Sequence, residues 1–336
     1  MKKVSLADVA QSLNLSKTLV SLVLNDKGDE YGINAEAQVR VREKAKELNY
    51  FPNQIAKTLR TKRSNTIGLI VTDISNPFYS KIARAIEQEA LKNGYHLICS
   101  SSEEDEQQET QLIHLLKDRQ QADGLIIATT QQDSTYLAQI KEQGYPFVLI
   151  DRYLPNFEAN TVCVDNYRGA FAMVEYLINK GRKDIGLLSL APSHISTISD
   201  RVKGYRDALV ENKISIREEL IQEVQFVDFK EGVKDALTKM LDNKKTRPNA
   251  IFALNNHLAI AAIEYLIENK VKMPDDIMVV SFDDVDTFKL INPQITAIAQ
   301  PTETIGQKAL SILLDQINNN VQEVQHVILP VHLIKR

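Results

Sequence analysis

The chain has 336 residues, 43% hydrophobic and 25% charged, with a formal net charge of −4. This length and composition predict a globular protein with two domains, or one large domain and an appendage. No segment approaches the roughly 18 consecutive apolar residues of a membrane helix. The N-terminus reaches Asp8 before any apolar run develops, which argues against a secretory signal. We therefore expect a cytoplasmic protein with no membrane association.

The charge is unevenly distributed along the chain. Residues 1–63 contain 12 Lys and Arg against 7 Asp and Glu, whereas the remainder contains 28 against 37. A basic head on an acidic body is typical of a nucleic-acid-binding protein with a separate sensing domain. The two cysteines, Cys99 and Cys163, stand in apolar, strand-like segments. They are predicted to be buried thiols in a reducing compartment.

The basic head shows three short helical patterns. Their apolar residues recur at helical spacing within residues 6–13, 19–24 and 39–48. Ser5 is the expected N-cap of the first helix, with Asp8 completing a capping box, and Ser16 is the expected cap of the second. Helix, short turn and helix with apolar inner faces predict a helix-turn-helix that binds DNA.

The second helix of this motif is the expected reader of DNA. A major groove admits one helix, and only its first turns reach the base edges. Lys17 and Thr18 stand at its start, where they can contact bases, while Ser16 can bind a phosphate. Leu22 can touch a thymine methyl but cannot donate to guanine. The acidic loop 26–34 is expected to point away from the phosphates.

After the polar run 60–65, read as a linker, strand and helix patterns alternate. The strand candidates are Ile67–Val71, His96–Ser100, Gly124–Ala128, Phe147–Ile150, Ile185–Leu190, Val224–Phe226, Ala250–Leu254, Met278–Phe282 and Val327–Leu333. Helices between apolar strands imply parallel crossovers. The series pauses near Thr161–Asn166 and restarts with similar spacing. The sequence therefore predicts two doubly wound α/β subdomains that face each other across a cleft. A late helix, Ile305–Ile317, suggests that the chain crosses between them more than once.

Several motifs in order along the chain resemble the lactose/galactose-repressor family of transcription regulators. They are SLADVA at 5–10, LSKTLVSLVLN at 15–25, LNYFPNQIAKTLR at 48–60, IGLIV at 67–71 and NPFY at 76–79. The resemblance extends over essentially the whole chain. It implies a helix-turn-helix domain at 1–51, a hinge helix and linker at 52–65, and a periplasmic-binding-protein-like body at 66–336. The body's first subdomain is expected at 66–163 and 294–322, and its second at 164–293 and 323–336.

The resemblance also implies a homodimer that reads a pseudo-palindromic operator. The hinge would fold on DNA, and Leu59 matches the position that wedges into the minor groove and kinks the duplex. Leu59 could instead be an ordinary helix-packing residue. The expected DNA-contacting residues are Ser5, Ser16, Lys17, Thr18, Ser21, Leu22, Asn25, Tyr50, Asn53, Ala56, Leu59 and Arg60.

No enzyme signature occurs in the sequence. The dinucleotide, kinase and P-loop glycine motifs are absent, as is the Gly-x-Ser-x-Gly elbow. The six histidines are scattered without metal-ligand spacing. We therefore expect neither catalysis, nor a cofactor, nor a metal site.

Open α/β sheets bind ligands at the carboxyl ends of their strands, and several unusual polar residues stand at such ends here. Arg201 in the segment 200–205 and Gln300 before Pro301 join them, and with the aromatic residues Phe78, Tyr79 and Phe229 they match the family's ligand pattern. The candidate small-molecule site is therefore Thr72, Asn76, Phe78, Tyr79, Asp151, Arg152, Arg201, Phe229, Asn255, Asp283 and Gln300. Arginine, carboxylate and aromatic groups suit a sugar or sugar derivative. Plainer roles are open: Asp283 could cap a helix, Arg201 could pair with Asp200, and Asn76 could form a turn.

The implied mechanism is allosteric, with the effector favouring one arrangement of the two subdomains and thereby changing operator affinity. Whether it releases or promotes DNA binding is left open. Two alternatives are left open. One is a regulator that answers to a nucleobase or a protein partner. The other is a sugar-binding protein without a role in transcription, although the head and the lack of a secretory signal argue against it. A sugar-converting enzyme would need a catalytic constellation that the sequence lacks.

Overall fold

The computed structural model describes residues 4–50, 63–242, 247–318 and 323–336. The chain divides into two compact units, Met1–Ser64 and Asn65–Arg336, called the head and the body below. In the described part of the chain, no helix is long and apolar enough to cross a membrane. The predicted combination of an all-helical head and an α/β body is confirmed.

The head contains α1 (Leu6–Leu13), α2 (Lys17–Leu24) and α3 (Ala35–Glu47). Ser5 and Asp8 form the predicted capping box at the start of α1, and the Ser16 hydroxyl accepts from the backbone N–H of Leu19 as the cap of α2. Asn34 caps α3. The three helices enclose one apolar cluster built on Val9, Ala10, Val20, Val23, Val41 and Ala45.

The acidic loop of the head is tied to α3. The Gln38 amide donates to Asp29 at 2.8 Å, and Arg42 pairs with Asp26 at 3.0 Å. Gly28 lies directly against the Gln38 side chain, where a Cβ would overlap the amide group. These contacts hold the loop on α3 and neutralise part of its acidic charge.

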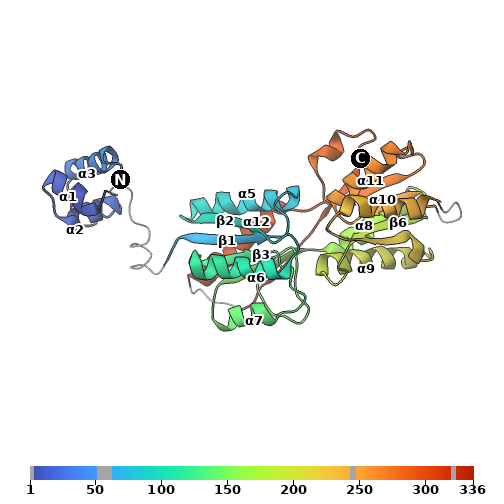
Figure 1. The fold of residues 1–336 in the computed structure, drawn as a ribbon, viewed down its shortest axis with the longest axis horizontal. Coiled ribbons are helices and arrows are strands. Elements are labelled where there is room, and N and C mark those ends of the chain that lie inside the picture. Colours follow the sequence, from blue (N-terminus) through green and yellow to red (C-terminus); the bar gives the residue numbers. More distant parts are fainter. Residues whose placement is uncertain (1–3, 51–62, 243–246, 319–322) are drawn as a thin grey trace. The chain divides into compact units, whose positions relative to one another are not determined.

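The first lobe of the body is a parallel six-stranded sheet in the order β11-β5-β4-β3-β1-β2. Its strands are β1 (Thr66–Val71), β2 (His96–Ser101), β3 (Gly124–Ile127), β4 (Phe147–Ile150), β5 (Thr161–Val164) and β11 (His326–Leu329). Its helices are α5 (Pro77–Lys92), α6 (Glu106–His114) with a π-helical turn η1 (Leu115–Arg119), α7 (Thr135–Glu142) and α12 (Thr302–Ile317). Helices cover both faces of the sheet (Figure 1).

The second lobe repeats this plan in the order β12-β10-β9-β8-β6-β7. Its strands are β6 (Ile185–Leu190), β7 (Ile221–Val224), β8 (Ala250–Ala253), β9 (Met278–Phe282), β10 (Thr296–Ala299) and β12 (His332–Ile334). Its helices are α8 (Asn166–Asn179), α9 (Ser196–Glu211), α10 (Phe229–Asp242) and α11 (Asn256–Glu268), with 3₁₀ turns η2 (Glu218–Leu220) and η3 (Asp286–Lys289). Only β12 runs antiparallel to its neighbour among the described strands. The two sheets confirm the predicted duplication.

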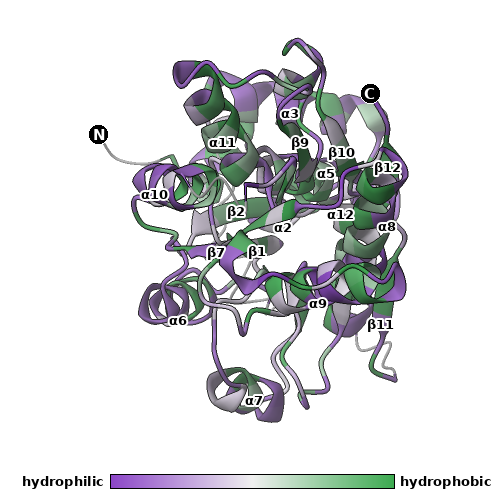
Figure 2. Cartoon of the chain, turned by 90° about the vertical axis from the view of Figure 1, so that its right-hand side faces the viewer, coloured by the Kyte–Doolittle hydropathy of each residue, from purple (hydrophilic) through white to green (hydrophobic). Residues whose placement is uncertain are grey.

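The apolar residues lie mainly on the strands and on the helix faces that cover them, while polar residues colour the outer helix faces (Figure 2). Strands such as β3, β4 and β8 are buried along their whole length. Burial on both faces produces the continuous apolar runs from which these strands were predicted.

The predicted boundaries between the subdomains are wrong at two places. Residues 294–322 were expected in the first subdomain, but β10 joins the second sheet. Residues 323–336 were expected in the second, but β11 joins the first sheet. The chain therefore crosses after β5, after β10 and after β11. Apolar strands of equal character can join either sheet, so sequence pattern alone does not assign them.

Three strand predictions and one cysteine also need correction. The predicted pause at Thr161–Asn166 contains β5, and Val327–Leu333 is two strands, β11 and β12, in different sheets. The strand near Val224–Phe226 is β7, which ends at Val224. Cys163 is buried as predicted, whereas Cys99 is exposed because β2 forms the edge of its sheet.

Candidate functional site

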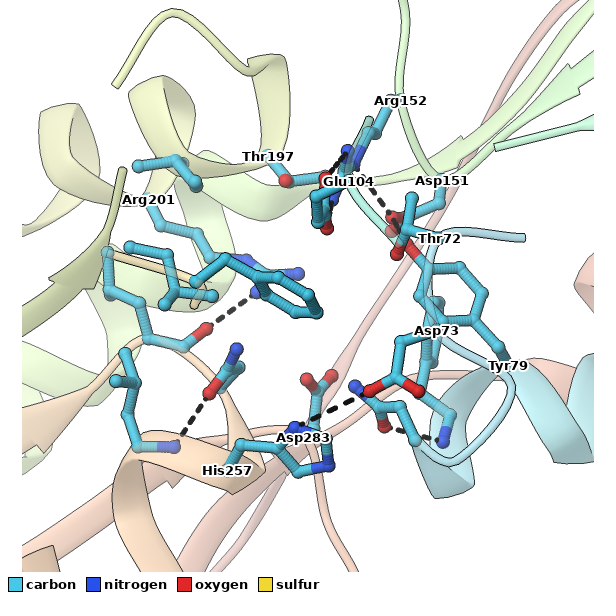
Figure 3. A pocket seen from close by; sticks show the side chains of 18 of the residues that line it. Thr72, Asp73, Tyr79, Glu104, Asp151, Arg152, Thr197, Arg201, His257 and Asp283 are labelled. Atoms are coloured by element: carbon cyan, nitrogen blue, oxygen red, sulfur yellow. Dashed lines mark hydrogen bonds and ion pairs between the residues drawn. The ribbon is translucent and has the colours of Figure 1, made fainter. Parts of the chain in front are cut away.

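The carboxyl ends of the strands in the two lobes face a shared cavity of about 590 Å³, part of it open to solvent. The lining residues are Thr72, Asp73, Asn76, Phe78, Tyr79, Glu104, Asp151, Arg152, Leu190, Thr197, Ile198, Arg201, Phe226, Leu254, Asn255, His257, Leu258, Asp283 and Gln300. They include ten of the eleven residues expected at the small-molecule site. Figure 3 shows charged side chains entering the cavity from both lobes.

Phe229 is the expected residue that does not line the cavity. It is the first residue of α10, and its ring stacks on that of His257 with the centroids 5.6 Å apart. His257 and Phe226 line the cavity instead. The sequence identified an aromatic residue in this segment but not which ring reaches the cavity, because that depends on where the turn before α10 ends.

Arg201 on α9 is held in place entirely by the second lobe. Its Nε donates to Asn166 Oδ1 at 2.8 Å, and one terminal nitrogen donates to the carbonyl oxygen of Leu254 at 2.6 Å. The guanidinium lies 3.7 Å from the centroid of the Phe282 ring. Burial lowers the pKa of Arg201, but a guanidinium stays charged in proteins. The expected alternative, an ion pair with Asp200, is not formed.

Asp151 and Asp283 occupy equivalent positions, directly after β4 and β9, the third strand in each sheet. Both have left-handed backbones, with φ of 65° and 71°, and both are buried. Aspartate tolerates this conformation better than most residues. Burial raises the pKa of each carboxyl, although the neighbouring arginines counteract this. Two buried acids at the mirrored ends of the sheets therefore face one cavity.

The two acids have different partners. Asp151 accepts from the Tyr79 hydroxyl at 2.8 Å, and its Oδ1 has no partner. Asp283 accepts from the Gln300 amide at 2.5 Å, and the Oε1 of Gln300 is also buried without a partner. Asp283 does not cap η3, whose preceding residue is Val285. Each acid thus has one side-chain hydrogen-bond donor, Tyr79 or Gln300. A buried oxygen of Asp151 and one of Gln300 remain without a partner among the residues that line the cavity.

Arg152 is neutralised by Glu104, a residue that the sequence analysis did not identify. The two form a bidentate pair with distances of 2.7 Å and 2.6 Å, and both side chains are largely buried. Burial disfavours the charged form of Arg152, but Tyr79, Glu104 and Asp151 together raise its pKa. Glu104 lies three residues beyond the end of β2, too far to be assigned from the strand pattern.

A buried carboxylate behind the cavity supports Arg152. Glu109 on α6 is fully buried and accepts from the Thr129 hydroxyl at 2.9 Å and from the backbone and hydroxyl of Thr130. Burial raises the pKa of Glu109, and these hydrogen bonds counteract the rise. The carbonyl of Thr129 accepts from Arg152 at 3.3 Å. Glu109 therefore fixes the segment on which Arg152 rests.

Four contacts connect the two lobes around the cavity. Asn256 donates to Asn76 at 3.2 Å, and Asp73 lies 3.8 Å from His257. On another side, the Tyr153 hydroxyl donates to the Asp200 carboxylate at 3.1 Å. The Tyr153 backbone N–H also donates to the Ser196 hydroxyl at 3.0 Å.

The asparagines combine structural and ligand-facing roles. Asn76 caps α5 by accepting from the backbone N–H of Phe78, and Asn255 caps α11 in the same way from Leu258. Both also line the cavity. Asn76 is therefore a helix cap, not the simple turn offered as its alternative, and the cap holds its side chain at the cavity.

Nine lining residues were not predicted from the sequence: Asp73, Glu104, Leu190, Thr197, Ile198, Phe226, Leu254, His257 and Leu258. Asp73 is polar and lies two residues past β1, where the rule that selected Thr72 could have found it. Leu190 ends β6 and Leu254 directly follows β8, but both are apolar and look like any other core residue. The others lie on loops or first helical turns, where no residue pattern marks the side that faces the cavity.

In the head, Lys17 and Thr18 are exposed at the start of α2, while Ser21 and Leu22 are half-buried. The Asn25 amide donates back to the Ser21 carbonyl at 2.6 Å. Tyr50 packs against the apolar cluster of the head, and burial raises the pKa of its hydroxyl. The expected contacts Asn53, Ala56, Leu59 and Arg60 lie outside the described residues. Their roles stay predictions.

Residues 64–336 match the family described as periplasmic binding proteins and the sugar-binding domain of the LacI family. The HTH-type transcriptional regulator DegA of Bacillus subtilis (strain 168) is 31% identical over 99% of this chain and 97% of its own length. The chain belongs to the LacI family. With its helix-turn-helix head, this LacI-family chain is a DNA-binding transcription regulator.

Solved LacI-family structures have the same fold. The lac repressor dimer bound to operator and the anti-inducer ONPF superposes with a TM-score of 0.86 at 26% identity, over 100% of this chain and 98% of that one. A LacI-family regulator from Enterococcus faecium with bound ribose gives 0.70 at 29% identity, covering 81% of this chain and 97% of that one. In the described part of this LacI-family chain, no group of three or more His, Cys, Asp or Glu could hold a metal ion.

Proposed function

We propose that this regulator represses transcription as a homodimer on a pseudo-palindromic operator, and that a small molecule in the cavity between the lobes controls its affinity for DNA. The observation that carries the proposal is the cavity itself. It is lined from both lobes by buried acids and arginines whose hydrogen-bonding capacity is only partly used. A ligand there touches both lobes at once, so its affinity depends on how they are arranged.

A carbohydrate is the proposed effector class. Planar guanidinium and carboxylate groups match adjacent hydroxyls, and the rings of Phe78 and Phe226 can cover an apolar sugar face. The E. faecium relative with bound ribose supports this class. A nucleobase or a protein partner is the alternative, to be separated by the binding experiments below.

For DNA, the proposal places α2 in the major groove. Lys17 and Thr18 are exposed in its first turn, and the capped N-terminus of α2 is suited to a phosphate. The hinge at 52–65 is proposed as a second element that reaches the minor groove through Leu59. Repression would follow from occupancy of the operator by two such heads.

The test begins with selection of operator sequences from a random duplex library by the purified protein. Fluorescence anisotropy then measures affinity for the selected duplex with and without sugars. Lys17→Ala should weaken binding about tenfold or more and relax base preference. Lys46→Ala is the control, because it removes the same charge from an exposed position on α3. It should weaken DNA binding less, and by the same factor for every DNA sequence. Equal effects of Lys17→Ala and Lys46→Ala would contradict the role of Lys17 in base recognition.

Leu59→Ala tests the hinge separately. It should lose operator affinity while leaving the binding of a sugar to the body unchanged, because the two sites lie in different units. Unchanged operator affinity would contradict the wedge role of Leu59. Failure to select any duplex would contradict sequence-specific repression as a whole.

A further inference from the structure

The pair between Glu104 and Arg152 changes what the cavity can bind. The two terminal nitrogens of Arg152 donate to the two carboxylate oxygens of Glu104. The same bidentate arrangement would otherwise suit an anionic ligand. Nε of Arg152 is buried without a hydrogen-bond partner and lies 3.7 Å from Asp151 Oδ2. Arg152 can therefore still donate from Nε, but its charge is already matched by neighbouring carboxylates.

The loop that presents Glu104 has an unusual backbone. Glu103 and Glu104 both adopt left-handed conformations, with φ of 52° and 57°. Left-handed backbones are uncommon for residues other than glycine, and two in succession are sustained only when surrounding contacts support them. Glu103 is exposed, whereas the side chain of Glu104 is 13% exposed and points at Arg152. The left-handed backbone of this loop thus places the Glu104 side chain in contact with Arg152.

The remaining charges make the cavity unfavourable for anions. Its lining holds four carboxylates, those of Asp73, Glu104, Asp151 and Asp283, against the two guanidinium groups of Arg152 and Arg201. Even when His257, which lies 3.8 Å from Asp73, is counted as a cation, the carboxylates outnumber the basic groups of the lining. In a partly buried site, this excess repels a phosphate or carboxylate more strongly than it would in water.

The unused hydrogen-bonding atoms also select against anions. Asp151 Oδ1 and Gln300 Oε1 are buried acceptors without donors, and Arg152 Nε is a buried donor without an acceptor. A hydroxyl group can donate to the first two and accept from the third. An ionised phosphate or carboxylate group placed beside these two oxygens offers acceptors only and would leave them unsatisfied.

We propose that the cavity takes an uncharged, hydroxyl-rich ligand, and that Glu104 is the residue that excludes anionic sugars. This inference rests on the proposed small-molecule site but not on DNA binding. Glu104 acts by occupying Arg152 and by adding one carboxylate to the lining. Sugar phosphates and sugar acids are thereby rejected, while neutral sugars retain Arg201, Asp151 and Asp283 as partners.

The first experiment is isothermal titration calorimetry of the full chain with two matched sets of ligands. One set is ribose, ribose 5-phosphate and ribonate, and the other is glucose, glucose 6-phosphate and gluconate, with guanine and hypoxanthine as nucleobase probes. The neutral member of at least one set should bind at least tenfold more tightly than its phosphate and its acid. Tighter binding of an anionic member, binding of a nucleobase alone, or no binding by either neutral sugar would overturn the proposal.

The second experiment measures the same sets with Glu104→Gln. This change frees Arg152, so the preference for the neutral sugar over its phosphate should fall at least tenfold. Glu103→Gln is the matched control, since it removes the same charge from the adjacent exposed residue and should leave the preference unchanged. An unchanged preference in Glu104→Gln, or an equal change in the control, would overturn the role of Glu104.

Glu104→Gln leaves Arg152 partly unmatched and can weaken folding. The double variant Glu104→Gln with Arg152→Gln removes both charges, and its preference for the neutral sugar should return toward that of the unaltered chain. If it accepts phosphates instead, Arg152 is not the group that Glu104 occupies. All of these readouts use direct ligand binding without DNA, so failure of operator binding would leave them interpretable.

Discussion

The two lobes of the body are built on one plan and use it for different chemistry. Both sheets place six strands in matching order, and each puts a buried aspartate with a left-handed backbone after its third strand. The second lobe supplies Arg201, which is held by neutral groups and keeps its charge available to the cavity. The first lobe supplies Arg152, which Glu104 neutralises. Duplicated topology thus sets where the side chains stand, while their neighbours set what each one can bind.

The helices that connect the lobes show the same duplication. The helix after β5, α8, packs in the second lobe against α9, and the helix after β10, α12, packs in the first lobe against α5. One helix that covers each sheet therefore comes directly after a strand of the other lobe. This exchange links the two lobes covalently at their facing edges, so a ligand that changes their arrangement acts on all the crossovers together.

The largest expected difference is between the two arginines. Arg201→Lys should weaken binding of the neutral sugar about 100-fold, because a lysine cannot keep the fork that reaches Asn166, Leu254 and the cavity, and charged hydrogen bonds contribute about 1.5–3 kcal/mol each. Arg152→Lys should weaken it about tenfold or less. Calorimetry measures both. Equal losses would show that the neutralised arginine binds the ligand as directly as the free one.

The paired aspartates offer the next comparison. Asp151→Asn and Asp283→Asn should each weaken sugar binding about 10- to 30-fold, since asparagine tolerates the left-handed backbone but is a weaker acceptor. Asp283→Ala should in addition lower stability by about 1–2 kcal/mol through backbone strain, seen as a melting temperature about 2–4 °C below that of Asp283→Asn. Strongly unequal losses between the two asparagine variants would break the equivalence of the two positions.

The pH dependence of binding follows from the same acids. Burial raises the pKa of Asp151 and of Asp283 above the ordinary value of 3.8. A ligand hydroxyl that donates to the ionised carboxylate favours the deprotonated form, so sugar affinity should fall as the solution is acidified through these raised pKa values. The fall approaches about tenfold per pH unit for one linked proton.

Calorimetry from pH 8 to pH 5 measures this dependence. Asp283→Asn removes one of the two titrating groups and should flatten the profile while leaving a shallower fall from Asp151. A profile that rises on acidification would mean that the ligand prefers the protonated acids. That result would also contradict the use of Asp151 Oδ1 as an acceptor.

The smallest expected effect comes from the contacts between the lobes. Tyr153→Phe removes the hydrogen bond to Asp200 and should weaken sugar binding about fivefold, because one partly exposed hydrogen bond contributes about 1 kcal/mol. Burial, with Asp200 beside it, raises the pKa of Tyr153 to about 12, so the hydroxyl is a donor throughout the neutral range. Tyr136→Phe on α7, away from the cavity, is the control. An identical loss in both variants would exclude a specific role for the contact.

Much of the site could be predicted because parallel sheets collect the residues that follow their strands. Thr72, Asp151, Asn255 and Asp283 were all found in this way, and all four line the cavity. Glu104 and His257 were not found, since a loop and a first helical turn carry no periodic signal for direction. Phe229 was chosen by family pattern, but the start of α10 turns its ring onto His257.

The sequence by itself determined the helix-turn-helix, with its caps at Ser5 and Ser16, the alternation of strands and helices, and the duplicated α/β plan. These features depend on local spacing and on capping chemistry, which neighbouring residues carry. The tertiary structure decided which sheet β10 and β11 join, that Cys99 lies at an exposed edge, and that Glu104 reaches Arg152. Each of these depends on contacts between residues far apart in the chain. Apolar strands and charged loops of similar composition can satisfy such contacts in several ways, and only packing selects one.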